Sequence, residues 1–424
     1  MTRRLTIALT LNLTLALGLA AGTANTAEVE HKYVDYKISA APTLSVPFPK
    51  TDAKAAGINA AALDRLVKRA AETHSDSLVV LRDGKLVGDW RFGKPQEPIE
   101  IMSVTKSVAN LAIGHLVTTG RLFSTDVPVS TWYPEWKQGK KASVTIGNLL
   151  SQTSGLRAEP SAQEVYNSAD ILRLALDAPL AHDPGTDFFY NNKAVNILGG
   201  IVQKISGKRL DEYMRDEVFA PLGIDHFSWM RDPAGNPHVM AGLKLDALDL
   251  AKIGQLMLNR GVWNGKQIVS AKWVDTSVHP AQAFQPNYGL LWWTVNQWSK
   301  LTLDGATLEA WRKGGAAPGF LDKMATLKDK DLTQEELSHA LDTLFGAGQG
   351  MTAYNQNVRA KGLPNPKRSV GPQIGFSGNG YLGQYIVVLT APKLVAIRQI
   401  RSDSYKGDQD SFDDFQTLVR GLVP

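Results

Sequence analysis

Ser103 and Lys106 are the residues whose types and spacing most directly allow chemistry in this chain. The stretch Ser103-Val104-Thr105-Lys106 reads S-x-x-K and opens an apolar segment with helical periodicity. Residues three apart share one face of a helix, so the lysine amine can reach the serine hydroxyl. A base within hydrogen-bond reach activates a serine nucleophile, and a desolvated lysine can be that base. So short a motif also occurs by chance on solvated helices, so its weight depends on the motifs that accompany it.

Tyr190-Asn191-Asn192 forms a second candidate cluster, with the pattern Y-x-N. It lies in a predicted loop just before a helix that begins near Val195. A tyrosine hydroxyl can relay a proton between the nucleophile and a leaving group, and the Asn192 amide can hold the lysine and a substrate carbonyl. The alternative interpretation is a buried structural tyrosine beside a helix-capping asparagine.

Periodic segments on both sides of these motifs predict the elements that position them. Apolar residues at helical spacing indicate helices, alternating or continuous apolar runs indicate strands, and Asp83-Gly84 is a strong two-residue turn. The predicted elements are a helix over 59–72, a hairpin over 77–92, helices over 103–118, 195–205 and 248–259, a buried strand over 288–293, two strands over 381–398 that turn at Ala391-Pro392, and a closing helix over 412–422.

This order of elements predicts an α/β (α+β) fold. An antiparallel sheet takes strands from both ends of the chain, helices flank it, and a mostly helical domain is inserted between them. We expect an extended lead-in over 28–57, a sheet domain from 58–102 plus 241–424, and the helical domain over 103–240. The polar stretch 299–373 is predicted to be an insertion between two strands, with one helix that a capping box at Thr333 to Glu336 begins.

Composition and the N-terminal segment predict a secreted globular protein. Of the 424 residues none is Cys, which excludes disulfides and thiol chemistry, and the formal net charge is only +5. That charge is nearly balanced for the length, so no nucleic-acid partner is predicted. Residues 1–27 resemble a signal peptide, with Arg3 and Arg4 before a short apolar run and small residues after it. We therefore expect periplasmic or secreted localisation without a stable membrane anchor.

The motifs together resemble the serine β-lactamase and penicillin-binding-protein superfamily, in particular its class C-like esterase branch with the 6-aminohexanoate-dimer hydrolases. The stretches that carry the resemblance are 103–106, 149–156 (LLSQTSGL), 184–192 and Pro221-Leu222-Gly223, in the family's order. The resemblance implies a β-lactamase/transpeptidase-like fold and an acyl-enzyme on Ser103. It also implies catalytic roles for Lys106 and Tyr190, and neither a cofactor nor a metal.

The family's third motif, a basic residue followed by any residue and glycine, has two candidate positions here. Lys313-Gly314-Gly315 matches the letters but precedes a helical pattern, so Lys313 is interpreted as a surface residue. Gly378-Asn379-Gly380 lacks the basic residue but leads into the predicted strand pair, and we place the motif there. The predicted substrate-binding residues are Asn192, Gly378, Asn379, Gly380 and Tyr381, with the backbone N–H groups of Ser103 and Tyr381 as the oxyanion hole.

The sequence thus predicts a serine hydrolase that cleaves a small-molecule ester or short amide. Because Gly378 cannot hold a carboxylate, neutral substrates are favoured over penicillins. A D,D-peptidase, a β-lactamase and a non-catalytic acyl- or peptide-binding sensor stay open as alternatives, as does the choice between Lys106 and Tyr190 as the base. A Ser-His-Asp hydrolase is disfavoured because no G-x-S-x-G occurs, and His115 is interpreted as a core residue. The sequence does not predict the oligomeric state.

Overall fold

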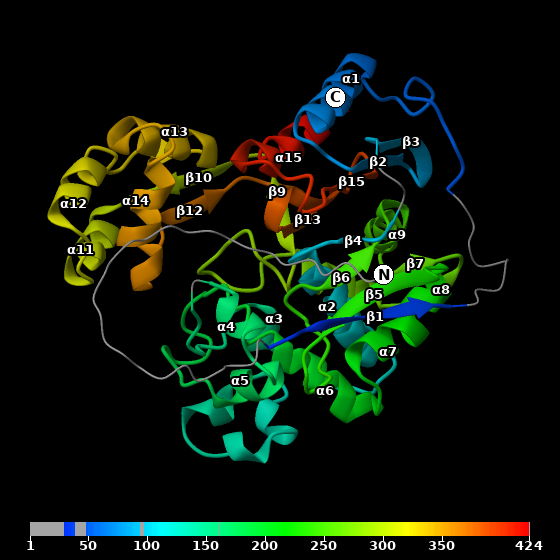
Figure 1. The fold of residues 1–424 in the computed structure, drawn as a ribbon, viewed down its shortest axis with the longest axis horizontal. Coiled ribbons are helices and arrows are strands. Elements are labelled where there is room, and N and C mark those ends of the chain that lie inside the picture. The colour runs from blue at the N-terminus through cyan, green and yellow to red at the C-terminus, as the bar shows by residue number, and fades with distance from the viewer. Residues whose placement is uncertain (1–28, 39–47, 94–96, 160, 424) are drawn as a thin grey trace, which may run out of the picture.

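A six-stranded antiparallel sheet forms the centre of the computed structural model, which describes residues 29–38, 48–93, 97–159 and 161–423 (Figure 1). Its strands come from both ends of the chain, as predicted, and the hairpin that turns at Asp83-Gly84 is confirmed. The predicted signal peptide lies outside the described residues. In spatial order the strands are β3 (Lys85–Arg91), β2 (Ser77–Arg82), β15 (Leu394–Gln399), β14 (Gln384–Leu389), β13 (Gln373–Gly380) and β9 (Trp293–Asn296).

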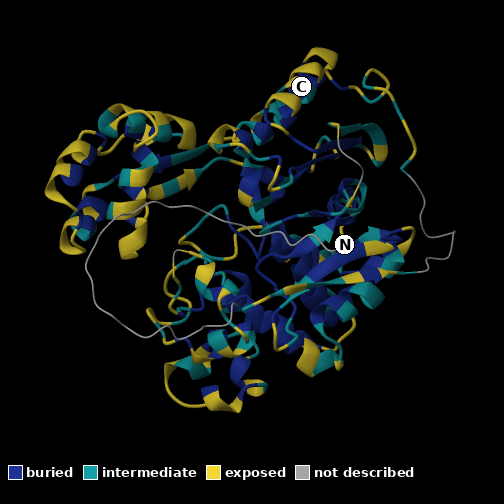
Figure 2. Cartoon of the chain, in the orientation of Figure 1, coloured by how far each residue is buried: buried dark blue, intermediate teal, exposed yellow. Residues whose placement is uncertain are grey.

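Both faces of this sheet are covered by helices. The terminal helices α1 (Ala60–Glu72) and α15 (Phe415–Arg420) cover one face, while α2 (Val104–Thr118) and α9 (Ala247–Leu258) pack on the other. Alternate residues of β2 show the consequence, since Leu78 packs toward the terminal helices and Val79 toward the opposite core. The inner strands β2, β14 and β15 and helix α2 are buried accordingly (Figure 2). The predicted α+β architecture is therefore confirmed.

A smaller antiparallel sheet lies beside the helical part of the chain. Its order is β1 (Lys32–Lys37), β5 (His226–Arg231), β6 (Leu243–Leu245) and β4 (Ile99–Glu100), so a piece of the predicted lead-in is a paired strand. The domain boundaries drawn from the sequence stay a prediction. The remaining elements of this part are α3 (Ile146–Leu150), α4 (Gln163–Tyr166), α5 (Ile171–Asp177), α6 (Asn196–Ser206), α7 (Leu210–Met214), α8 (Ala220–Leu222), the hairpin β7 (Val262–Trp263) and β8 (Lys266–Gln267), and α10 (Ala271–Val278).

The insertion leaves the central sheet after β9 and returns as β13, which pairs directly with β9. It packs around its own apolar core, to which Trp311, Phe320 and Leu341 belong, and it projects to one side in Figure 1. Thr333 caps its third helix through the predicted capping box. The elements of the insertion are β10 (Ser299–Thr302), α11 (Gly305–Lys313), α12 (Pro318–Ala325), β11 (Asp331–Leu332), α13 (Gln334–Phe345), α14 (Gly350–Asn357) and β12 (Lys367–Val370).

The predicted strand over 288–293 is wrong in its extent, although its burial is right. Strand β9 begins only at Trp293, and the preceding residues form a buried loop in which Leu291 has φ 61°. Side chains of α2 bind the loop's carbonyls, with Ser107 Oγ donating to Leu291 O at 2.7 Å and Asn110 Nδ2 to Leu290 O at 2.8 Å. Because these carbonyls are satisfied by a helix, the segment has no need of a strand partner.

The strand predicted to start at Tyr381 also differs. Gly378 to Gly380 end strand β13 rather than begin the next strand, and β14 begins at Gln384. Between them Leu382 and Gly383 have φ of 66° and 83°, which breaks the extended run and turns the chain. The later turn at Ala391-Pro392 is confirmed, because β14 pairs with β15 across it.

Candidate active site

Ser103 stands at the turn from strand β4 into helix α2. The residue before it, Met102, has φ 48°, an uncommon conformation for a side chain of this size. Tight backbone bonds then start the helix, from Val104 N to Ile101 O and from Thr105 N to Met102 O, each at 3.0 Å. The turn leaves Ser103 only partly buried in an otherwise buried segment, so its hydroxyl is accessible for reaction.

Lys106 lies one turn further and contacts the serine, as predicted. Its Nζ is 3.0 Å from Ser103 Oγ and donates to Met240 O at 2.7 Å. The side chain is 1% exposed and forms no ion pair among the described residues. Burial holds its pKa well below the ordinary lysine value, which favours the neutral amine. A neutral amine can donate to Met240 O and still accept the serine proton.

Tyr190 packs against the same pair. Its ring centroid is 4.8 Å from Lys106 Nζ, and its hydroxyl shares a hydrogen bond with the Ser103 side chain. The ring stacks on Trp293 and meets Tyr288 edge-on. Burial raises the pKa of Tyr190 to about 12, although the bond to Ser103 acts in the opposite direction. The phenol is therefore protonated at neutral pH, which favours Lys106 as the base and Tyr190 as the proton donor.

Asn192 lines a cavity next to Tyr190, but it does not hold the lysine as expected. Among the hydrogen bonds of the described residues, the Lys106 amine instead donates to Met240 O. Sequence reasoning missed Asn196, whose side chain joins the two segments involved. Its Nδ2 donates to Asn192 O at 3.0 Å, and its Oδ1 accepts from Val239 N at 2.9 Å. Asn192 lies before the first residue of α6, so no helical spacing signalled this contact.

Asn191, the middle residue of the Y-x-N motif, is a second residue that sequence reasoning missed. It is 2% exposed and fastens the loop through three side-chain hydrogen bonds. Its Oδ1 accepts from Lys193 N and Ala194 N, and its Nδ2 donates to Leu156 O. The loop that carries Tyr190 is thus fixed to the start of α6 and to the 149–156 stretch.

The third motif passes directly beside the nucleophile. A Cβ built on Gly380 would lie 2.6 Å from Ile101 O, two residues before Ser103. A Cβ on Gly378 would lie 3.0 Å from Ser107 Oγ on α2. Glycine is therefore required where this strand approaches the helix so closely. In contrast, Asn379 faces away, because its Oδ1 accepts from Gln416 Nε2 on α15 at 3.3 Å, and its side chain is not positioned for the substrate role expected of it.

The ring of Tyr381 is not enclosed in the site, because the residue is 72% exposed. Tyr381 opens a short 3₁₀ turn and Ser103 is the N-cap of α2, and the first N–H groups of a helix have no partner within it. That these two N–H groups form the oxyanion hole stays a prediction.

Arg398, which sequence reasoning also missed, fixes this turn from behind. Its buried guanidinium donates to Leu382 O and Gly383 O, at 2.7 and 2.9 Å, and to three further acceptors.

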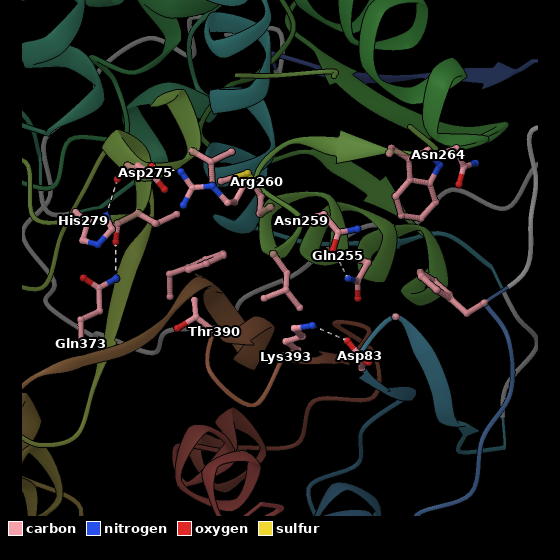
Figure 3. A pocket seen from close by; sticks show the side chains of 18 of the residues that line it. Asp83, Gln255, Asn259, Arg260, Asn264, Asp275, His279, Gln373, Thr390 and Lys393 are labelled. Carbon is pink, nitrogen blue, oxygen red and sulfur yellow. Dashed lines mark hydrogen bonds and ion pairs between the residues drawn. The ribbon is translucent and has the colours of Figure 1, made fainter. Parts of the chain in front are cut away.

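Other parts of the described chain offer less chemistry. Figure 3 shows a cavity lined by Gln373, at the end of β13 opposite Gly380. Its charged side chains pair with one another, as Lys393 does with Asp83 at 3.1 Å. His115 is a satisfied core residue, bonded to Tyr213 OH, and Lys313 is exposed, as expected. Within the described ranges we find no cluster of three or more potential metal ligands and no helix able to span a membrane.

Known proteins resemble this chain in sequence or in fold. The Beta-lactamase family profile matches residues 63–408. "Protein flp" of Staphylococcus aureus (strain MW2) is 28% identical over 187 residues, which cover 40% of this chain and 37% of that protein. The chain therefore aligns with less than half the length of this relative.

Two solved structures have the same fold. The "Putative 6-aminohexanoate-dimer hydrolase from Bacillus anthracis" has a TM-score of 0.63 and 18% identity, covering 93% of this chain and 92% of that one. The octameric penicillin-binding protein homologue from Pyrococcus abyssi has a TM-score of 0.54 and 19% identity, covering 86% and 78%. Both likenesses concern the fold alone, which is β-lactamase/transpeptidase-like, as the sequence predicted.

Proposed function

From the premise that the chain belongs to the beta-lactamase family of serine hydrolases and penicillin-binding-protein-like proteins, we propose that it hydrolyses esters or short amides through an acyl-enzyme on Ser103. The observation that carries the proposal is the buried Lys106 Nζ, 3.0 Å from Ser103 Oγ and without a carboxylate partner among the described residues. That geometry supplies a nucleophile with a neutral base in contact with it.

Each step then has a residue to perform it. Ser103 Oγ attacks the carbonyl carbon while Lys106 takes the hydroxyl proton, and the N–H groups of Ser103 and Tyr381 stabilise the oxyanion. Tyr190 gives a proton to the leaving alcohol or amine as the carbonyl–leaving-group bond breaks, and Lys106 replaces that proton. Water then attacks the acyl-enzyme, which releases the acid and restores Ser103.

The form of the third motif favours neutral groups at the reacting centre. A side chain at position 378 would meet Val104 and Ser107 of α2, at 3.2 and 3.0 Å from its Cβ. Helix α2 thus closes over the position where the family resemblance expects a basic residue. A substrate carboxylate next to the scissile bond would have no cation at this position, which disfavours penicillins and peptidoglycan stems.

The test compares purified protein with its Ser103→Ala variant on p-nitrophenyl acetate, p-nitrophenyl butyrate, nitrocefin and a 6-aminohexanoate dimer. We expect Ser103-dependent cleavage of the esters or the linear amide, little nitrocefin turnover, and Ser103-dependent labelling by a fluorophosphonate. Fast nitrocefin hydrolysis would instead favour a β-lactamase. Absence of both labelling and turnover would favour a binding sensor.

We also propose that the protein is exported, on the basis of the signal-like residues 1–27. N-terminal sequencing of protein from the periplasm or medium would test this, and a start at Met1 would contradict it.

A further inference from the structure

Gln152 is buried beside the loop that carries Tyr190, and no step of the proposed mechanism uses it. It lies in the 149–156 stretch, directly after α3 and its C-cap Ser151, and it is 2% exposed. Its φ is 62°, a left-handed conformation that is costly for a residue with a side chain. Such a conformation persists where the surrounding contacts impose it, so the contacts of Gln152 indicate its role.

Gln152 holds the backbone on both sides of Tyr190. Phe189 N donates to Gln152 O at 2.9 Å, and Asn191 N donates to Gln152 Oε1 at 2.7 Å. One residue thus accepts from the N–H groups that directly precede and follow the tyrosine. The Gln152 side chain also lies against the hydroxyl of Tyr288, whose ring meets the Tyr190 ring edge-on at 6.4 Å between centroids. The backbone and the ring of Tyr190 are therefore both constrained from this position.

Gln152 is in turn connected to the helix that begins at the nucleophile. The carbonyl of Leu150, two residues before it, accepts from Leu291 N at 3.0 Å. The carbonyl of Leu291 accepts from Ser107 Oγ on α2 at 2.7 Å. These bonds make one connection from α2, through the buried loop before β9 and the end of α3, to both sides of Tyr190. Because hydrogen bonds are directional, the connection restrains the tyrosine relative to the start of α2.

Resting on the proposed function, we propose that Gln152 is a positioning residue, which holds the Tyr190 hydroxyl where it can protonate the leaving group. It acts through Tyr190 and takes no part in bond making or breaking itself. The loss of Gln152 should therefore slow the step in which the carbonyl–leaving-group bond breaks. An alkoxide is a poor leaving group and needs the proton of Tyr190, whereas p-nitrophenolate leaves as a stable anion. The size of the loss should thus depend on the leaving group.

The test compares benzyl acetate with p-nitrophenyl acetate, which share the acyl group and differ in the leaving group. Gln152→Met keeps the length of the side chain but removes the acceptor of Asn191 N. We measure kcat/KM, which reports the steps up to release of the leaving group. The ratio of kcat/KM for p-nitrophenyl acetate to that for benzyl acetate should rise about 100-fold above the wild-type ratio, the effect of ~1 Å of misplacement of the proton donor. A merely destabilising substitution lowers both values by the same factor and leaves the ratio unchanged.

Gln255→Met is the matched control. Gln255 is also a buried glutamine, and its Nε2 donates to Asn259 Oδ1 at 2.8 Å, but it lines the cavity of Figure 3. This variant should keep the wild-type ratio. Should Gln152→Met not fold, Gln152→Gly replaces it, because glycine adopts a positive φ readily and keeps the carbonyl that binds Phe189 N. A wild-type ratio in a folded Gln152→Met or Gln152→Gly protein, whether or not both values have fallen, would overturn the proposal.

Failure of the proposed function gives a different result. The wild type would then turn over neither ester in a Ser103-dependent manner. Hydrogen exchange of the Asn191 amide in the Ser103→Ala protein would still report on Gln152, since the bond to Gln152 Oε1 needs no catalysis. We expect this amide to exchange faster when Gln152→Met is added, and unchanged exchange would contradict the constraint that the proposal requires.

Discussion

Gly380→Ala should disable the active site without touching any reacting group. The added Cβ would lie 2.6 Å from Ile101 O, whereas ordinary contacts begin at 3.4 Å, so the backbone must yield by about 0.8 Å. Ile101 precedes Ser103 by two residues and belongs to the turn that projects it. A misplacement of ~1 Å costs about 100-fold in rate, which is the loss of kcat/KM that we expect. Overpacking should also lower the free energy of unfolding by about 1–3 kcal/mol.

The assay is p-nitrophenyl acetate hydrolysis, normalised to the fraction of protein that a fluorophosphonate titrates, together with urea unfolding. Gly319→Ala is the matched control, since Gly319 lies in helix α12 and a Cβ added there would meet no atom within 4 Å. It should keep wild-type activity, and its stability should be unchanged or higher by up to about 1 kcal/mol. A folded Gly380→Ala protein with wild-type kcat/KM would refute the claim that this glycine positions Ser103.

Three buried residues give four further predictions. Because the neutral Lys106 is the base and its pKa is lowered, kcat/KM should rise with pH to a plateau below the ordinary lysine range, and a fall with rising pH would exclude that role. The pKa of this lysine is higher in the unfolded chain than in the native state, so below pH ~10.4 the unfolded state binds a proton that the native state does not. Lowering the pH should therefore destabilise the wild type relative to Lys106→Met, which thermal unfolding at several pH values would measure. Asn191→Ala should lose about 2–4 kcal/mol of unfolding free energy in urea, because the substitution leaves three hydrogen-bonding groups without a partner. The same substitution at the exposed Asn355 should lose almost none. Arg398→Lys should lower both the free energy of unfolding and kcat, since an ammonium cannot reproduce the five directed hydrogen bonds of the guanidinium. An unchanged kcat in a folded variant would show that Arg398 does not position the turn at Leu382 and Gly383 for catalysis.

Local chemistry made the central part of the site predictable from sequence. The S-x-x-K spacing requires only a helix, so the contact between Ser103 and Lys106 followed from one turn of regular structure. Likewise the hairpin at Asp83-Gly84 and the cap at Thr333 depend on residues close in the chain. The placement of Tyr190 beside them came from the family resemblance, because no local rule joins residues so far apart.

What the sequence did not predict depends on contacts between distant segments. The extent of β9 is decided by α2 side chains that bind the carbonyls of Leu290 and Leu291. The end of β13 is decided by a turn whose carbonyls Arg398 binds from another strand. Asn379 was assigned to the substrate with its neighbours, but strand alternation turns its side chain to the opposite face.

The lowered pKa of Lys106 does not depend on a basic residue at position 378. A second cation beside Lys106 would lower its pKa, as like charges do, but here burial is the cause of the lowered pKa. The base therefore needs no cation at position 378, and α2 can pack against the strand there.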